Sequence, residues 1–180
     1  MNIVKKGSTG NDVKRIQQTL KQIGLYNGKI DSIFDFKTEK AVKEFQRTFG
    51  VVSDGIVGPK TWNLLNKAKQ VKHFKVREFA CRHCGQVRLN IDLLLKLEQL
   101  RTKTGPLVIN SGYRCPTHNK NINGAKNSQH IQGRAADIRA TNMTPNIVAT
   151  YAEQVGFDGI GKYQNFTHVD VRGYKARWRG

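Results

Sequence analysis

Two histidines and an aspartate in the second half of the sequence have the residue types and spacing of a metal site. His130 and Asp137 are seven residues apart around Gly133, and His168 follows 31 residues after Asp137 inside an alternating segment. A catalytic zinc ion takes nitrogen and carboxylate ligands from the protein and keeps one position open for water. Gly133 would let the chain bend so that Asp137 reaches the same ion as His130. We therefore predict a zinc site made of His130, Asp137 and His168.

A zinc-bound water also needs a proton acceptor, because the metal lowers the pKa of the water towards about 7. Asp170 is our first candidate for this general base, since it lies two residues after His168 and would share its face of a strand. The rival role is to accept the far ring N–H of a ligand histidine and so orient that ring. The sequence leaves both roles of Asp170 open.

The turn at residues 111–114 and the segment before His130 supply further candidates. A developing oxyanion needs positive charge besides the metal, and Arg114 offers a planar guanidinium fork. Its alternative role is an ion pair with a structural acid. Ser128 could bind a substrate amide or cap its own loop. We predict Arg114 as a catalytic residue and Ser128 and Tyr113 as substrate-binding residues.

The three cysteines, Cys81, Cys84 and Cys115, are too few for a disulfide scaffold. Cys81-x-x-Cys84 followed by Gly85 can be half of a zinc knuckle. The other half would need Cys115 together with His83 or His118. Buried or paired thiols are the simpler expectation.

The elements that must position these residues predict an α+β unit. Helices are expected at residues 91–103, capped by Asn90, and at residues 146–154. An apolar run at 106–110 predicts a buried strand, and residues 159–163 and 167–172 predict a strand hairpin. Residues 74–79 are expected to be extended. This order suits a small antiparallel sheet with helices.

The first 66 residues predict a small all-α domain. Helices are expected at residues 12–23, from a cap at Thr38 to Gly50, and from Pro59 onwards. Residues 31–38 match residues 54–61 in Asp, Ile, Lys and Thr, which favours two similar helical units packed together. The polar, lysine-rich residues 67–73 predict a linker between domains at 1–66 and 74–180.

The formal net charge of +18 predicts a polyanionic partner, such as nucleic acid, an anionic membrane or anionic wall polymers. Motifs for specific nucleic-acid recognition are missing from the sequence, so that partner is not expected. No apolar run approaches the roughly 18 residues that would span a bilayer. The first residues lack the apolar segment of a secretory signal, so we expect a mature form or another route out of the cell. We expect a monomer.

Two resemblances cover most of the chain. Residues 24–31, 41–46 and 54–62 resemble the three-helix peptidoglycan-binding domain of many wall hydrolases. The segments around Ser111–Asn119, Ser128–Asp137 and His168–Gly173 resemble the D-alanyl-D-alanine carboxypeptidase-like zinc peptidases of the M15 family. That resemblance implies a fold shared with the hedgehog signalling domain, zinc bound by His130, Asp137 and His168, and Arg114 as transition-state stabiliser. Several relatives carry a catalytic carboxylate three residues before the last histidine, where this sequence has Asn165.

These observations predict a zinc-dependent peptidase that hydrolyses a peptide bond in the stem peptide or cross-link of bacterial peptidoglycan, with a phage endolysin as the expected setting. The bond cut is left open among D-alanyl-D-alanine carboxypeptidase, L-alanyl-D-glutamate endopeptidase and cross-link endopeptidase. The alternative is a non-catalytic wall-binding protein with a structural zinc. The net charge would favour adhesion to teichoic acids.

Overall fold

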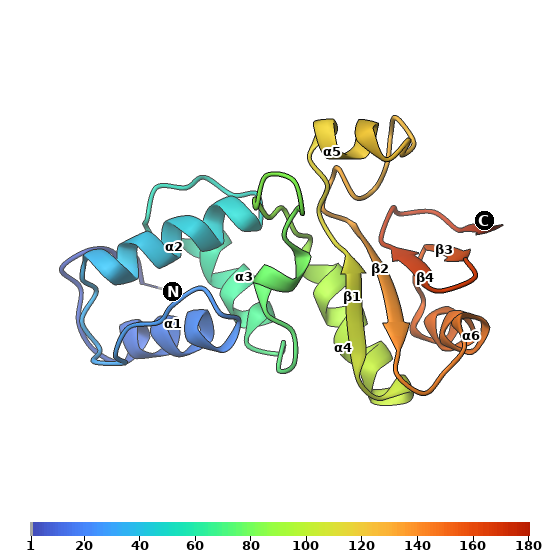
Figure 1. Cartoon of the computed structure of the whole chain (residues 1–180). Helices are drawn as coiled ribbons and strands as arrows, with labels where there is room; N and C mark the ends of the chain where they lie inside the picture. Colours follow the sequence, from blue (N-terminus) through green and yellow to red (C-terminus); the bar gives the residue numbers. More distant parts are fainter. Residues whose placement is uncertain (1) are drawn as a thin grey trace. The chain divides into compact units, whose positions relative to one another are not determined.

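A computed structural model describes residues 2–180 and divides into two compact units, with the boundary between Val76 and Arg77 (Figure 1). The first unit contains α1 (Asn11–Gln22), α2 (Phe36–Thr48) and α3 (Pro59–Ala68), and the short helix η1 (Val76–Phe79) follows. The second unit contains α4 (Ile91–Thr104), β1 (Leu107–Ser111), α5 (Pro116–Asn121), β2 (Ala135–Ala140), α6 (Pro145–Val155), β3 (Gly159–Lys162), β4 (Thr167–Asp170) and β5 (Ala176–Arg179). None of the helices described here has the length and apolar character to cross a membrane.

The three predicted helices of the first unit are confirmed, with one correction at a helix start. Pro59 is the first residue of α3, as predicted. α2 begins two residues before Thr38, and its cap is Asp35, whose carboxylate accepts the backbone N–H of Thr38 at 2.8 Å. The prediction of Thr38 as cap is wrong, because Thr38 already lies buried inside the first helical turn. The core of this unit includes the apolar stripe of α1, Phe45 on α2, and Trp62 and Leu65 on α3.

A buried glutamine forms hydrogen bonds to each copy of the sequence repeat. The side-chain nitrogen of Gln17 donates to Asp31, Ile33 and Thr38, and that of Gln46 donates to Asp54, Ile56 and Thr61. These are the matched positions of the two copies. The glutamine oxygens in turn accept backbone N–H groups of the same turns, from Asp31 and Ser32 in one copy and Gly55 in the other. Each turn is therefore fixed to a neighbouring helix by one side-chain amide whose nitrogen and oxygen both form hydrogen bonds.

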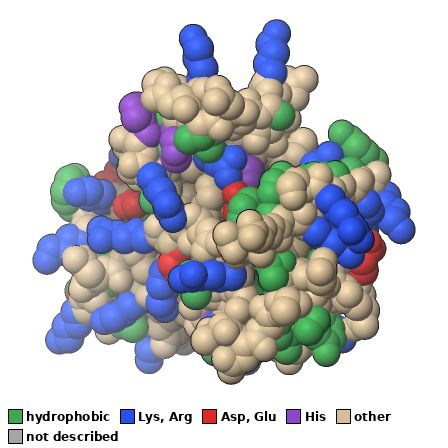
Figure 2. Space-filling model, turned by 45° about the vertical axis from the view of Figure 1, so that its right-hand side comes forward, with side chains coloured by type: hydrophobic (Ala, Val, Ile, Leu, Met, Phe, Trp, Pro, Cys, Tyr) green, Lys and Arg blue, Asp and Glu red, His purple; other side chains and the backbone are tan. Residues whose placement is uncertain are grey.

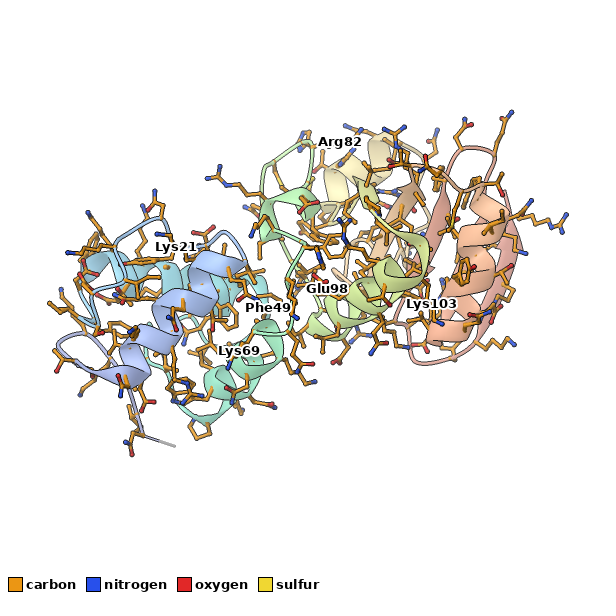
Figure 3. The ribbon with its side chains drawn as sticks, turned by 90° about the horizontal axis from the view of Figure 1, so that it is seen from below. Lys21, Phe49, Lys69, Arg82, Glu98 and Lys103 are labelled. Atoms are coloured by element: carbon orange, nitrogen blue, oxygen red, sulfur yellow. The ribbon has the colours of Figure 1, made fainter. Side chains whose placement is uncertain are left out.

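The stretch predicted as a linker is held against the first unit. α3 continues to Ala68, and the side chain of Gln22 donates to the carbonyls of Lys69 and Val71 at 2.9 and 2.6 Å. Val71 and Phe74 are buried. In Figure 3, Lys21 and Lys69 project from this unit, and Phe49 lies at the end of α2.

The second unit is built on a five-stranded sheet with the order β1-β2-β4-β3-β5. Neighbouring strands are antiparallel from β1 to β3, and β5 adds in parallel beside β3. α6 packs on β2, β3 and β4, and α4 packs on α6. The α+β class is confirmed. The parallel β5 departs from the predicted antiparallel sheet, and the expected extended segment at 74–79 contains η1 instead.

The strand β2 was not predicted from the sequence, and it is the strand that organises the sheet. Its residues Ala-Ala-Asp-Ile-Arg-Ala have little intrinsic preference for strands, but five of the six are buried between β1 and β4. Asp137 lies at its centre, opposite Ser111 on β1 and His168 on β4. The pairing register alone therefore brings Asp137 beside His168.

Basic side chains are scattered over the face of the molecule in Figure 2. Lys and Arg side chains are spread over the face shown in Figure 2, and acidic side chains are few on it. This distribution agrees with the net charge of +18 and with the absence of a single basic tail in the sequence. On this face the positive charge is therefore spread out and not gathered in one patch.

Candidate metal centre

The three predicted metal ligands meet in the second unit. His130 Nε2 lies 3.2 Å from Asp137 Oδ1 and 3.2 Å from His168 Nδ1, and the last two atoms are 2.9 Å apart. All three residues are buried, with 2%, 6% and 8% of their surface exposed. Zinc bound to nitrogen and oxygen at about 2.0–2.2 Å in a tetrahedron spaces its ligand atoms roughly 3.3–3.6 Å apart. The observed triangle is within a few tenths of an ångström of that spacing.

His130 is held in the tautomer that a metal needs. Its Nδ1 lies 2.6 Å from the carbonyl oxygen of Gly112, which can only accept a proton, so Nδ1 carries the hydrogen. The Nε2 lone pair is then directed at Asp137 and His168. Burial lowers the pKa of His130, since desolvation disfavours the charged ring. A neutral imidazole with a free lone pair is the form that binds a metal.

His168 is oriented by Asp170 on its opposite ring nitrogen. His168 Nε2 lies 2.9 Å from Asp170 Oδ2, so the neutral ring donates that proton and leaves the Nδ1 lone pair for the cluster. Burial opposes a charge on His168, but its hydrogen bonds to Asp137 and Asp170 outweigh this effect and raise its pKa. The raised pKa reflects the negative surroundings of the ring; when both rings are neutral, two nitrogen lone pairs and a carboxylate oxygen converge on one point. A bound cation resolves that repulsion, so the residues fit a zinc ion.

Asp170 itself is completely buried and fully engaged. Arg172 donates to both of its oxygens, with Nε at 2.9 and 3.1 Å and a terminal nitrogen at 2.6 Å. Burial alone would raise the pKa of Asp170, but the hydrogen bonds from His168 and Arg172 lower it to about 2. The carboxylate is thus held ionised against two donors.

Arg114 contacts the other oxygen of the predicted ligand Asp137. One terminal nitrogen of its guanidinium donates to Asp137 Oδ2, and its Nε donates to Ser111 Oγ at 2.8 Å. Burial acts to raise the pKa of Asp137, but hydrogen bonds from His130 and His168 lower it further than burial raises it. The structure therefore places Arg114 beside the cluster, and its acidic partner there is a metal-ligand candidate.

The two predicted substrate residues lie in different surroundings. Ser128 Oγ accepts the backbone N–H of His130 at 3.3 Å, which is the loop-capping contact considered as its alternative role. The backbone N–H of Tyr113 donates to the carbonyl of Phe79. Burial, and then the nearby thiol of Cys84, raise the pKa of the Tyr113 phenol. The Tyr113 side chain is therefore a neighbour of the cysteines.

Sequence reasoning gave no role to Arg172 and Trp178, which also border the cluster. The Trp178 ring lies 5.0 Å from the His168 ring, and the Arg172 guanidinium lies 5.0 Å above the Trp178 ring. Gly161 makes room for this indole, because a Cβ there would come within 2.4 Å of it. Arg172 could have been found from the spacing of two that links it to Asp170 and His168. Trp178 carried no such signal, since it arrives on the unpredicted strand β5.

Comparison with known families gives two matches that together cover most of the chain. The model described as Peptidase M15 matches residues 39–170, and the model described as a putative peptidoglycan binding domain matches residues 9–65. All three metal-ligand candidates, Arg114 and Asp170 lie inside the first match.

Individual relatives agree with these families. The zinc D-Ala-D-Ala carboxypeptidase of Streptomyces albus G is 30% identical over 193 residues, which cover 91% of this chain and 73% of that protein. The spore cortex-lytic enzyme of Bacillus cereus is 41% identical over 66 residues, 37% of this chain and 26% of that enzyme. Among solved structures, the SleB N-terminal domain is 40% identical with a TM-score of 0.37, over 38% of this chain and 93% of that one. The Burkholderia AP3 phage endolysin is 22% identical with a TM-score of 0.34, over 64% and 42%.

Proposed function

We propose that this chain, which belongs to the peptidase M15 family, hydrolyses a peptide bond of bacterial peptidoglycan with a zinc ion held by His130, Asp137 and His168. The observation that carries this proposal is the convergence of two imidazole nitrogens and a carboxylate oxygen in a buried site. When bound there, zinc supplies a Lewis acid and an activated water. A three-residue ligand set leaves a coordination position open, as hydrolysis requires.

In this reaction the protein residues hold charge and geometry. Asp137 and the two neutral imidazoles bind the metal, and the Gly112 carbonyl and Asp170 fix the direction in which each imidazole points. Arg114 has Nε on Ser111 and one terminal nitrogen on Asp137. We assign its other terminal nitrogen to the substrate, where it would stabilise the developing oxyanion or bind a terminal carboxylate.

For Asp170 we propose the positioning role in preference to the general base. Its oxygen contacts His168 Nε2, the nitrogen on the far side of the ring from the cluster. Arg172 occupies both of its oxygens and helps to hold its pKa at about 2, whereas an effective base has a pKa near the working pH. Both features suit an ionised group that orients His168 by accepting a hydrogen bond from its Nε2–H.

The bond that we place first is the terminal D-alanyl-D-alanine bond of the stem peptide. The Streptomyces albus relative is a zinc D-Ala-D-Ala carboxypeptidase, and this chain covers 73% of its length. A carboxypeptidase must recognise a free carboxylate at the end of its substrate, and Arg114 provides the matching cation beside the metal ligands. An endopeptidase that cuts L-alanyl-D-glutamate or cross-link bonds is the second possibility.

The first unit would bind the protein to the wall. Residues 9–65 match a peptidoglycan-binding domain, and the basic surface would add adhesion to anionic wall polymers such as teichoic acids. Release during phage-induced lysis is the setting we propose. Adhesion should weaken as salt rises, because exposed charges more than about 10 Å apart are screened at roughly 0.1 M ionic strength.

Product analysis on purified wall fragments tests the proposal. The zinc-loaded protein should release D-alanine from stem pentapeptides, as measured by mass spectrometry, and a strong chelator should stop the reaction until zinc is returned. New amino termini inside the stem or cross-link would assign an endopeptidase instead. Wall binding without any product, at full zinc occupancy, would favour the non-catalytic wall-binding alternative and overturn the enzymatic proposal.

A further inference from the structure

A second group of metal-binding side chains lies in the same unit, apart from the His130–Asp137–His168 cluster. The sulfur atoms of Cys81, Cys84 and Cys115 all lie within 4.8 Å of one another. Cys81 and Cys84 come from the loop after η1, and Cys115 caps the start of α5, more than thirty residues later. Cys81 and Cys115 are buried, with 2% and 9% exposed, and Cys84 is exposed. The fold therefore gathers every cysteine of the chain at one point.

The loop that carries Cys81 and Cys84 has the features of a zinc knuckle. The backbone N–H of Gly85 donates to the Cys81 carbonyl at 2.8 Å, and the N–H of Cys81 donates to the Gln86 carbonyl at 2.9 Å. Gly85 adopts φ +70°, a left-handed conformation that glycine takes without strain. The turn between the two cysteines is thus closed so that both sulfurs point to one side.

Backbone donors aimed at the sulfurs favour thiolates. The N–H of Cys115 donates to Cys81 Sγ at 3.4 Å, and the N–H of His118 donates to Cys115 Sγ at 3.4 Å. Thiolate is the form of cysteine that binds a metal, and several thiolates at this spacing repel one another unless a cation lies between them.

Two histidines each approach one of the sulfurs, and neither has a ring nitrogen within 4.8 Å of all three, so a fourth ligand has to turn towards the cluster. We take His118 as that ligand. Its Nδ1 lies 3.4 Å from Cys81 Sγ, and His83 Nδ1 lies 3.5 Å from Cys115 Sγ. Tetrahedral zinc with bonds of about 2.3 Å to sulfur and 2.0–2.1 Å to nitrogen separates such atoms by roughly 3.6 Å. His118 is half-buried in the first turn of α5, whereas His83 is exposed between the two cysteines of the loop. Cys115-x-x-His118 also repeats the spacing of Cys81-x-x-Cys84.

We propose that Cys81, Cys84, Cys115 and His118 bind a second, structural zinc ion. Three sulfurs and one imidazole form one of the common structural zinc sets, and thiolates select zinc over magnesium or calcium. Such a closed set leaves no position for a reacting water, so the ion would be structural. The proposal does not depend on the peptidase activity, because none of its ligands belongs to the His130–Asp137–His168 cluster.

The ion would tie the loop after η1 to the segment that follows β1. Two hydrogen bonds join these segments without the ion. Arg82 (labelled in Figure 3) donates to the carbonyl of Asn110, and the backbone N–H of Tyr113 donates to the carbonyl of Phe79. Cys115 directly follows Arg114, which contacts Asp137. The second zinc would therefore fix the backbone that presents Arg114 to the catalytic cluster.

Zinc content of the reduced full-length protein tests this inference. The wild type should keep two zinc ions per chain after desalting, one for each cluster. Cys84→Ser should keep one, and since Cys84 is exposed this variant should retain its fold by circular dichroism. His168→Ala should also keep one. With cobalt in place of zinc, the sulfur-to-cobalt charge-transfer absorption should be present in the wild type and in His168→Ala, and lost in Cys84→Ser.

The histidine variants test the fourth ligand. His118→Ala should lose the second zinc on desalting, while the matched control His83→Ala should keep it. The reverse result would overturn the assignment of His118. A reduced wild type that holds a single zinc, with three thiols that react freely with a thiol reagent, would overturn the second site as a whole. A wild-type protein that holds both zinc ions but has no peptidase activity would refute only the proposed function.

Discussion

The role of Asp170 can be decided by replacing it with asparagine. The substitution keeps the shape of the side chain but removes its negative charge. In the wild type, the carboxylate accepts a hydrogen bond from His168 Nε2–H at 2.9 Å. An amide that turns its nitrogen towards the ring would favour the opposite tautomer, with the proton on Nδ1. That tautomer lacks the lone pair which the metal needs. If Asp170 positions His168, Asp170→Asn must therefore weaken zinc binding.

The size of the effect follows from its contacts. Loss of a partner that orients a ligand histidine usually costs about 10–100-fold in metal affinity. This corresponds to about 1.4–2.8 kcal/mol. Arg172 would also lose its charged partner, and breaking a buried ion pair costs about 3–5 kcal/mol of folding free energy. The lower end applies here, since the Arg172 side chain is 17% exposed and keeps its contact with the Trp178 ring.

Two measurements on the same variant separate the two roles. Zinc affinity is measured by competition with a coloured chelator, and turnover is measured at saturating zinc. A positioning role predicts affinity reduced about 10–100-fold and turnover largely restored by excess zinc. A general base predicts unchanged zinc affinity and turnover reduced about 10²–10⁴-fold at every zinc concentration. The latter result would refute our reasoning. Asp158→Asn is the matched control, because Asp158 binds the Gly173 N–H and does not touch the cluster.

Three further predictions address the ligands, the repeat and the two units. His168→Ala should lose the catalytic zinc, as measured by elemental analysis after dialysis; full retention would contradict the ligand assignment. Gln46→Ala should destabilise the first unit by about 2–4 kcal/mol in urea unfolding, because buried groups left without a partner cost about 1–3 kcal/mol each. The exposed Gln18→Ala should change stability by less than about 0.5 kcal/mol. A chain of residues 77–180 should keep its activity on soluble peptides and lose activity on whole walls, and an equal loss on both substrates would argue against a targeting role for the first unit.

Most elements could be predicted from the sequence, and the failures have identifiable physical causes. Helices with a continuous apolar stripe, such as α1, can be predicted because their apolar residues recur with a period close to 3.6. β2 does not, because its alanines have low strand preference and become a strand only through pairing on both edges. The repeat at residues 31–38 and 54–61 was visible, but its buried partners Gln17 and Gln46 were not. They sit 29 residues apart, outside the offset of 23 that relates the two copies.

The metal ligands were predictable because their residue types are restrictive, whereas the roles of their neighbours depend on which atoms face each other. The chain has only five histidines, so few other combinations of histidines with a carboxylate could form a metal site. By contrast, the sequence could place Asp170 on the same face as His168 but could not show that Arg172 occupies both of its oxygens. That contact is what favours the positioning role of Asp170 over the role of general base.

The segment from Gly112 to Cys115 explains why the two clusters lie on a common support. Gly112 gives its carbonyl to His130, and its backbone fits closely against Phe79, where a Cβ would come within 2.5 Å of the Phe79 Cα. Two residues on, Arg114 contacts Asp137, and the next residue, Cys115, joins the sulfur cluster. One short segment thus fixes a ligand histidine, presents the predicted transition-state cation and ends in a ligand of the proposed structural zinc. A zinc ion at the cysteines would therefore restrain the catalytic cluster through the three peptide bonds that join Gly112 to Cys115.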